Sequence, residues 1–282
     1  MPELPEVETI ARGLNQRVAG EVIESVWLGE KPEPLKSPAK EIVAVLERSR
    51  IEQVRRVGKH IVFDLVRPSR NGRSPAATSA QWIVHLGMTG RMLIASPETE
   101  IEKHTHALLK LASGRELRFV DPRRFGRLAV VRMESKSAAG FAAPGDEPLQ
   151  AQAERFVTLF RGRKTPIKGA LLNQRLLSGV GNIYADESLF RAGIRPRRRA
   201  SSLTRDELRK LHAAVQEVLK EAIALGGSSV SDYVDAEGRE GFFQLQHRVY
   251  GREGESCLVC RTPIKRVIIA GRSSHYCPRC QK

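Results

Sequence analysis

The pattern of hydrophobic and polar positions divides the chain into a β-rich first part and a helical second part. Near the start, Val7, Ile10, Leu14 and Val18 recur at helical spacing, and Pro5 suits the first turn of that helix. Short runs of β-favouring residues follow, several of them separated by glycine-containing turns as in hairpins. These runs are 22–26, 51–57, 61–66, 82–86, 91–95, 107–111, 116–120 and 126–131. Many short strands with tight turns predict a β-sandwich or a β-barrel.

Two segments without hydrophobic periodicity interrupt this pattern. Residues 67–80 are rich in Ser, Pro, Ala and Arg, which predicts a surface insertion without a function of its own. Residues 135–148 combine small residues with glycine and proline, which is typical of a linker between domains.

Beyond the linker the periodicity is helical. Amphipathic runs occupy 167–177 and 183–191, with a glycine-rich turn at 179–181 between them. Thr204 and Glu207 have the spacing of a capping box, and the helix that they predict ends at Gly226. Its apolar face is formed by Leu208, Leu211, Val215, Leu219 and Ile223.

Composition excludes several classes of protein. With 41% hydrophobic and 28% charged residues, the 282-residue chain is neither disordered nor collagen-like. No apolar run approaches the ~20 residues that span a bilayer, which excludes a transmembrane protein. The acidic, proline-bearing start does not have the pattern of a secretory signal. We therefore expect a cytoplasmic protein with no membrane partner.

The formal net charge of +15 is unevenly distributed. Residues 1–65 carry a net charge of −1 and residues 66–282 a net charge of +16, of which +8 lies in 154–199 and +5 in 250–282. Such a surplus is expected for a protein that binds a phosphate backbone, although a solubilising surface has the same signature. Aromatic residues make up only 5% of the chain, which favours a duplex over a stacked single strand.

All four cysteines lie in the last 26 residues, as Cys257-x2-Cys260 and Cys277-x2-Cys280 with sixteen residues between the pairs. This spacing predicts a four-cysteine zinc site with a two-stranded ribbon between the two turns. Two disulfides are the alternative, which the absence of a secretory signal disfavours. With four protein ligands the zinc would be structural and would not activate water, and no organic cofactor is predicted.

Two segments in the helical part begin helices next to basic residues. Lys168 follows Thr165-Pro166-Ile167, and Asn182 follows Gly179-Val180-Gly181. Free N–H groups at a helix N-terminus bind phosphate, and glycines allow close approach. Binding of DNA and a plain helical bundle are both compatible with this pattern.

The N-terminus offers a candidate nucleophile. Removal of Met1 is expected because Pro2 is small, and it would leave a secondary amine that titrates near pH ~8. Attack of this amine on a sugar carbon would give an iminium, which acts as an electron sink, and Glu3 could donate a proton to the opening sugar ring. A helix that starts with proline and acidic residues accounts for the same pattern without chemistry.

Together these segments resemble the bacterial formamidopyrimidine-DNA glycosylase family, whose members excise oxidised purines such as 8-oxoguanine. The resemblance runs from residue 2 to residue 282 and leaves only the insertion and the linker unmatched. It is carried by PELPEVET, RRVGKH, HLGMTG, KHTH, DPRRFG, TPIK, GVGNIYADE, VYGREGESC and YCPRCQK.

The resemblance implies five catalytic side chains. Pro2 resembles the nucleophile that attacks C1′ of the damaged nucleotide, Glu3 the proton donor to the ring oxygen, and Glu6 a carboxylate that arranges the site. Lys59 is similar to the lysine associated with β-elimination, and Arg272 to the arginine of δ-elimination and phosphate binding. The activity implied is that of a monomeric, bifunctional DNA glycosylase and AP lyase.

The resemblance also implies DNA contacts. Met88, Arg123 and Phe125 match the residues that fill the void left by the flipped nucleotide, where they offset the cost of unstacking. The loop 226–233 corresponds to the loop that closes over an extruded 8-oxoguanine. The other implied contacts are His104, Arg163 and Lys164, with Lys168 and Asn182 at the phosphates around the flipped nucleotide.

The fold implied is α+β and multidomain. It comprises an N-terminal β-sandwich with an N-terminal helix (1–134), a linker (135–150), a helix–two-turn–helix domain with the lesion-capping loop (151–246) and a C-terminal zinc ribbon (247–282). The expected partner is double-stranded DNA that contains oxidised purines, and the expected location is the bacterial cytoplasm, in association with the nucleoid.

Three alternatives remain. The endonuclease VIII branch shares the proline chemistry but prefers oxidised pyrimidines; Leu4 and the complete set of Met88, Arg123 and Phe125 favour the purine branch. A non-enzymatic zinc-ribbon protein that binds damaged DNA would need neither a free Pro2 nor Lys59. An RNA-binding protein is disfavoured because no aromatic stacking motif of RNA readers is present.

Overall fold

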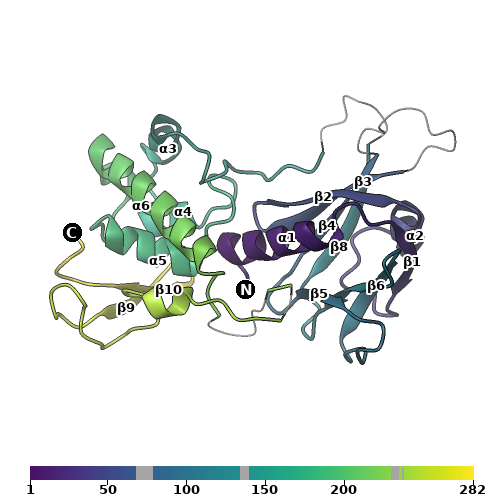
Figure 1. Ribbon diagram of the computed structural model, residues 1–282. Helices are drawn as coiled ribbons and strands as arrows, with labels where there is room; N and C mark the ends of the chain where they lie inside the picture. Colours follow the sequence, from purple (N-terminus) through teal and green to yellow (C-terminus); the bar gives the residue numbers. More distant parts are fainter. Residues whose placement is uncertain (68–78, 134–139, 230–234, 237) are drawn as a thin grey trace. The chain divides into compact units, whose positions relative to one another are not determined.

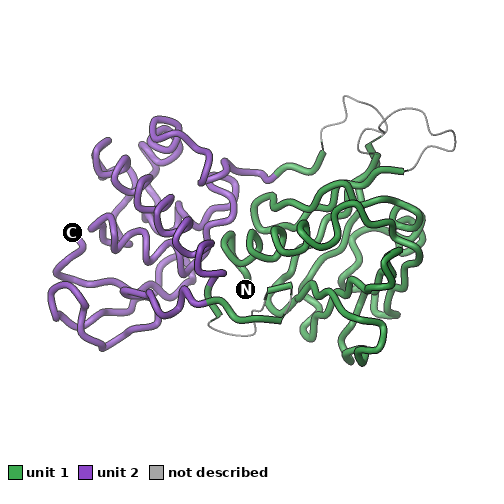
Figure 2. Tube along the Cα trace, viewed as in Figure 1, with its two compact units in different colours: residues 1–142, 228–241 green, residues 143–227, 242–282 purple. Residues whose placement is uncertain are grey.

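The computed structural model describes residues 1–67, 79–133, 140–229, 235–236 and 238–282 (Figure 1). The chain divides into two compact units (Figure 2). The first unit comprises residues 1–142 and 228–241, and the second comprises residues 143–227 and 242–282. Residues 68–78 of the predicted insertion and 134–139 around the predicted linker lie outside the described residues, as do 230–233 of the predicted capping loop and residues 234 and 237.

The first unit contains a sandwich of two antiparallel four-stranded sheets. One sheet has the order β1 (Ile23–Leu28), β6 (Thr105–Leu111), β7 (Glu116–Val120) and β5 (Arg91–Ala95). The other has the order β2 (Arg50–Val57), β3 (His60–Val66), β4 (Ala80–His85) and β8 (Arg127–Arg132). All eight predicted strands are confirmed, and the sandwich is the correct choice between the two predicted β architectures.

Helix α1 (Leu4–Val18) packs against β2 and β3. Its predicted apolar face is confirmed, because Val7, Ile10, Leu14 and Val18 are all buried in the core that the two sheets share. A second helix in this unit, α2 (Ala39–Leu46), was not expected from the sequence. It has only eight residues, which is too short for a clear helical period, and it buries Ile42, Val45 and Leu46.

The second unit is helical and ends in a hairpin. Helices α3 (Ala153–Phe160) and α5 (Asn182–Arg191) pack against the long α6 (Arg205–Ala224). Short turns of 3₁₀-helix, η1 (Ala200–Ser202) and η2 (Phe243–Gln246), and the hairpin of β9 (Lys265–Ile269) and β10 (Arg272–Tyr276) complete it. The predicted capping box is confirmed, since Thr204 Oγ1 accepts the Glu207 N–H at 3.1 Å and the Glu207 carboxylate accepts the Thr204 N–H at 2.8 Å.

The helix predicted over 167–177 is wrong in its length. Helix α4 spans only Ile167–Leu171, and the chain then turns. The Gln174 side chain holds this turn by donating to the Leu172 and Val180 carbonyls at 3.0 and 2.8 Å and by accepting the Gly179 N–H at 2.9 Å. A side chain that bonds the backbone in this way competes with the helical ladder, which ends the helix early.

Candidate functional site

The start of the chain is held by a buried carboxylate. Pro2 is buried directly before α1, and Glu3 is the N-cap residue of that helix. One oxygen of Glu6 accepts the Glu3 N–H at 2.8 Å, and the other accepts the Ser228 N–H at 2.8 Å. Glu6 therefore fixes the backbone of the N-terminus and joins it to the segment that begins the predicted capping loop.

Lys59 lies in the tight turn between β2 and β3, beside Gly58 with its positive φ of 60°. Arg56 connects this turn to α1. Its guanidinium forms an ion pair with Glu8 at 2.7 Å and donates to the Gly58 carbonyl at 3.1 Å. Arg56 thus ties the turn that carries Lys59 to helix α1, which begins just after Pro2 and Glu3.

Two histidines are partners across β3 and β4. The rings of His60 and His85 are tilted by 52° relative to each other, with centroids 4.9 Å apart. Burial lowers the pKa of His85 to about 4, and the positive charges of Arg127 and Lys59 act in the same direction. A neutral His85 has a lone pair on Nδ1, which accepts the Gly87 N–H at 3.1 Å. His85 thereby shapes the turn that presents Met88.

The three residues predicted to fill the void lie on two loops of the first unit. Met88 follows β4 and is 42% exposed, and Phe125 precedes β8 and is 53% exposed. The Arg123 guanidinium lies 4.8 Å from the centre of the Phe125 ring, in a cation–π contact. His104 is exposed and accepts the Asp121 N–H through its carbonyl, which places it next to the same loop. Apolar and cationic side chains that protrude in this way are suited to insertion into a base stack.

In the second unit, Arg163 and Lys164 are exposed directly before α4, as expected of residues that contact phosphates. Lys168 is different. Its side chain is fully buried, and its ammonium forms an ion pair with Asp186 at 2.7 Å and donates to the Ser273 carbonyl at 2.6 Å. A direct phosphate contact of Lys168 does not follow from this geometry, because the charge is already compensated inside the protein.

Lys168, Asn182 and Arg272 nevertheless come together. Asn182 is the first residue of α5, and its side-chain amide lies 3.5 Å from the Ser273 hydroxyl. Arg272 is exposed at the start of β10, next to Ser273. Lys168 therefore holds the strand that carries Arg272, and the N-terminus of α5 lies beside that strand.

Two neighbouring acids of α5 were missed by the sequence analysis. Asp186 accepts the His275 N–H at 2.8 Å, and Glu187 accepts the N–H groups of Arg248, Val249 and Tyr250 at 2.8 to 3.0 Å. Both carboxylates are buried. Adjacent acids between the apolar runs Ile183–Ala185 and Leu189–Phe190 of this helix are the signal that could have identified them, since a buried charge requires compensation.

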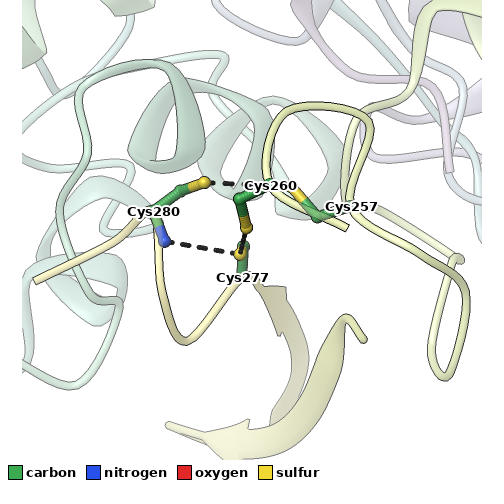
Figure 3. Close-up of side chains that lie close together, drawn as sticks. All are labelled: Cys257, Cys260, Cys277 and Cys280. Atoms are coloured by element: carbon green, nitrogen blue, oxygen red, sulfur yellow. Dashed lines mark hydrogen bonds between the residues drawn. The ribbon is translucent and has the colours of Figure 1, made fainter. Parts of the chain in front are cut away.

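The four cysteines converge at the end of the chain, with their side chains turned toward one another beside the hairpin (Figure 3). All four sulfurs lie within 4.8 Å of one another, and the Cys260–Cys277 and Cys257–Cys280 pairs are separated by 3.4 and 3.9 Å. A tetrahedral zinc with Zn–S bonds of about 2.3 Å places its sulfurs about 3.8 Å apart, so the four thiols fit this ion. All four cysteines are free, so the disulfide alternative is wrong.

Comparison with known sequence families finds three matches along the chain. The N-terminal domain of formamidopyrimidine-DNA glycosylase matches residues 1–128, and its H2TH domain matches residues 144–234. The zinc finger found in FPG and IleRS matches residues 254–282. In the part of the chain that the structure describes, no helix has the length and apolar character needed to cross a membrane.

Curated relatives align over the full chain. Formamidopyrimidine-DNA glycosylases of Solibacter usitatus and Desulfitobacterium hafniense are 45% and 43% identical to it, with 100% of both chains covered in each alignment. Among solved structures, Lactococcus lactis FPG mutant G226P in complex with a Fapy-dG containing DNA has a TM-score of 0.87 at 32% identity and complete coverage of both chains. MutM (FPG) from Thermus thermophilus has a TM-score of 0.82 at 42% identity and covers 99% of this chain and 98% of its own.

The β-sandwich, the H2TH helical domain and the four-cysteine zinc finger define an α+β, DNA-binding glycosylase of DNA repair. Among such enzymes, the chain belongs to the formamidopyrimidine-DNA glycosylase family. The resemblance expected from the motifs is thereby confirmed.

Proposed function

We propose that this protein is a bifunctional DNA glycosylase and AP lyase that removes oxidised purines, 8-oxoguanine and formamidopyrimidines, from duplex DNA. The observation that carries this proposal is the position of Pro2, buried at the start of α1 beside Glu3, with the backbone fixed by Glu6. Removal of Met1 is a required step, because it frees the Pro2 nitrogen as a secondary amine.

In the first reaction, the Pro2 nitrogen attacks C1′ and the glycosidic bond breaks, so that the base leaves with the bonding electron pair and takes up the proton that the amine loses. Glu3 donates a proton to the ring oxygen as the sugar opens, and an iminium joins Pro2 to C1′. Glu6 is a positioning residue, because both of its oxygens are engaged by backbone N–H groups.

In the second reaction, the iminium acidifies C2′. Loss of that proton and cleavage of the C3′–O bond give β-elimination, which we assign to Lys59. A further proton loss and cleavage of the C5′–O bond give δ-elimination, assigned to Arg272. The bonds of Arg56 to Glu8 and to the Gly58 carbonyl support the role of Lys59, because they tie the turn of Lys59 to the helix that follows Pro2.

Recognition of DNA is assigned to side chains of both units, all of them exposed except Asn182, which is half-buried. His104, Arg163, Lys164 and Asn182 would contact the backbone, and Met88, Arg123 and Phe125 would occupy the space of the flipped nucleotide. The Lactococcus lactis FPG structures contain Fapy-dG and abasic-site DNA, and we extend these ligands to the present chain. We propose that it acts as a monomer in the bacterial cytoplasm, in association with the nucleoid.

The four cysteines would hold one structural zinc ion, which supplies folding energy to the hairpin and takes no part in the reaction. No organic cofactor is needed, because the amine of Pro2 provides the electron sink. Lys168 and Asp186 hold the strand that carries Arg272, and the four cysteines with their zinc ion would fix the end of the same hairpin.

The proposal is tested with end-labelled duplexes that contain 8-oxoguanine opposite cytosine, or thymine glycol opposite adenine. We expect incision of the purine substrate to be faster and to leave phosphates at both ends of a one-nucleotide gap. A preference for thymine glycol would instead assign the enzyme to endonuclease VIII-like specificity. Binding without incision, also at a preformed abasic site, would show that the protein is not an enzyme of this kind.

A further inference from the structure

The loops that carry Met88 and Phe125 are in backbone contact. Gly87 has a φ of +62°, and a Cβ atom at this position would lie only 2.5 Å from the Phe125 carbonyl carbon. A Cβ on Gly126 would overlap the Phe119 ring. Gly87 therefore packs against the backbone of Phe125 and Gly126 without room for a side chain, so the two turns are in close contact at this point.

A single buried carboxylate joins these loops. Asp121 is fully buried, and its Oδ1 accepts the Thr89 hydroxyl at 2.6 Å while its Oδ2 accepts the Gly126 N–H at 2.7 Å. The Arg123 N–H lies 3.3 Å from both Asp121 Oδ1 and Thr89 Oγ1. The Asp121 carbonyl lies 2.9 Å from Nε2 of the buried His106, which fixes the residue from its other side.

Burial of a carboxylate costs free energy unless hydrogen-bond donors compensate its charge. The Asp121 carboxylate accepts from Thr89, Arg123 and Gly126, which lie on the two loops. Met88 directly precedes Thr89, and Arg123 and Phe125 closely follow Asp121. The hydrogen bonds thus connect the backbone positions from which the three exposed side chains project. Rigid support of this kind is what insertion into a base stack requires.

We propose that Asp121 and Thr89 form a clasp that holds Met88, Arg123 and Phe125 in one fixed arrangement for insertion into the duplex. Both are positioning residues, which act through the three exposed side chains. This role rests on the proposed function, in which those side chains fill the void opposite the lesion. The clasp couples the position of Met88, the apolar side chain on one loop, to the position of Arg123, the cation on the other loop.

Thr89 provides the sharpest test, because Thr89→Val removes the hydroxyl while it keeps the shape and leaves the Asp121–Gly126 bond in place. Each variant is assayed on two substrates: a duplex with 8-oxoguanine opposite cytosine, and a preformed abasic site in single-stranded DNA, which has no partner base to separate. Thr89→Ser, which keeps the hydroxyl, is the matched control. Thermal unfolding of each variant verifies the fold.

We expect Thr89→Val to lower single-turnover excision from the duplex about tenfold, because the variant loses the hydrogen bond to the Asp121 carboxylate and the longer contact with the Arg123 N–H. Cleavage of the single-stranded abasic site should not fall with it, and Thr89→Ser should behave as the wild type. A 2-aminopurine placed next to the cytosine should brighten less on binding of Thr89→Val, because less unstacking occurs.

Met88→Ala and the double variant complete the test. If Thr89 acts through Met88, the excision rate of the double variant should lie within about twofold of the rate of the slower single variant. Three results would each overturn the clasp while the proposed function stands. These are an equal loss of activity on both substrates, losses of the two single variants that multiply in the double variant, and no loss in Thr89→Val. A wild type inactive on both substrates would overturn the proposed function and the clasp together.

Discussion

Glu6, Asp186 and Glu187 are buried carboxylates that accept backbone N–H groups from segments distant in the sequence. Glu6 holds Ser228, Asp186 holds His275, and Glu187 holds the chain at 248–250. A carboxylate compensated in this way is strongly directional, because each oxygen requires its donors at hydrogen-bonding distance. At the scale of single residues, these acids determine where the functional segments lie.

Glu187→Gln tests this role in the second unit. The substitution keeps the size, but one of the two oxygens becomes an NH2 group that faces a backbone N–H donor. We expect a loss of about 1–3 kcal/mol in the free energy of unfolding for the donors left unsatisfied. Urea denaturation measures it, with Glu217→Gln on the exposed face of α6 as the control. Equal stability of the two variants would contradict the role of Glu187.

His85 predicts a dependence of stability on pH. Its ordinary pKa of 6.5 applies to the unfolded chain, and its pKa in the fold is about 4. Between these values the unfolded chain binds a proton that the folded chain does not, so stability falls as the pH is lowered from 6.5 to 4. Urea denaturation at several pH values should show a shallower fall for His85→Gln than for the wild type. Identical slopes would show that His85 does not contribute.

At the scale of elements, the zinc hairpin and the β-sandwich should respond differently to loss of metal. The hairpin has a core of only a few residues, Val249, Cys257, Ile264 and Cys277, whereas the sandwich has a large core of its own. We expect chelation to abolish amide protection in 257–282 and to leave β2, β3 and β4 protected, because small zinc modules unfold without metal. Hydrogen exchange measures this, with Cys260→Ser as a second route to metal loss. Retained protection of the hairpin in both cases would contradict a structural zinc.

Elements were predictable from the sequence where local signals determine them. The strands, the capping box at Thr204 and the cysteine spacing are local patterns, and the structure confirms them. Helix α2 is too short to show a period, and α4 ends early because Gln174 bonds its own turn.

Contacts between distant segments could not be predicted in the same way. Arg56 meets Glu8, and Lys168 meets Asp186 and Ser273, only once the chain has folded. The sequence indicated that Lys168 carries a charge, but it could not show that this charge is compensated inside the protein. The individual catalytic and DNA-binding assignments therefore stay predictions.

At the scale of the whole molecule, the net charge of +15 should govern affinity for DNA. Arg163 and Lys164 are exposed before α4, in the segment 154–199 that carries a net +8. Arg163→Ala and Lys164→Ala should each make the slope of log Kobs against log salt less steep, by about 0.9 for every phosphate that the variant no longer neutralises. Arg50→Ala, an exposed arginine of β2 with no assigned role in DNA binding, is the control. Equal slopes for all three variants would contradict the assignment.

The central claim is that the nitrogen of Pro2 carries out the chemistry, and borohydride trapping tests it most directly. The protein, with removal of Met1 verified by intact mass, is mixed with a duplex that contains 8-oxoguanine opposite cytosine and reduced. The account predicts a covalent adduct that peptide mapping places on Pro2, and strong loss of the adduct in Pro2→Gly and in a protein with an extended N-terminus. An adduct mapped to a lysine, or undiminished trapping by the extended protein, would contradict it.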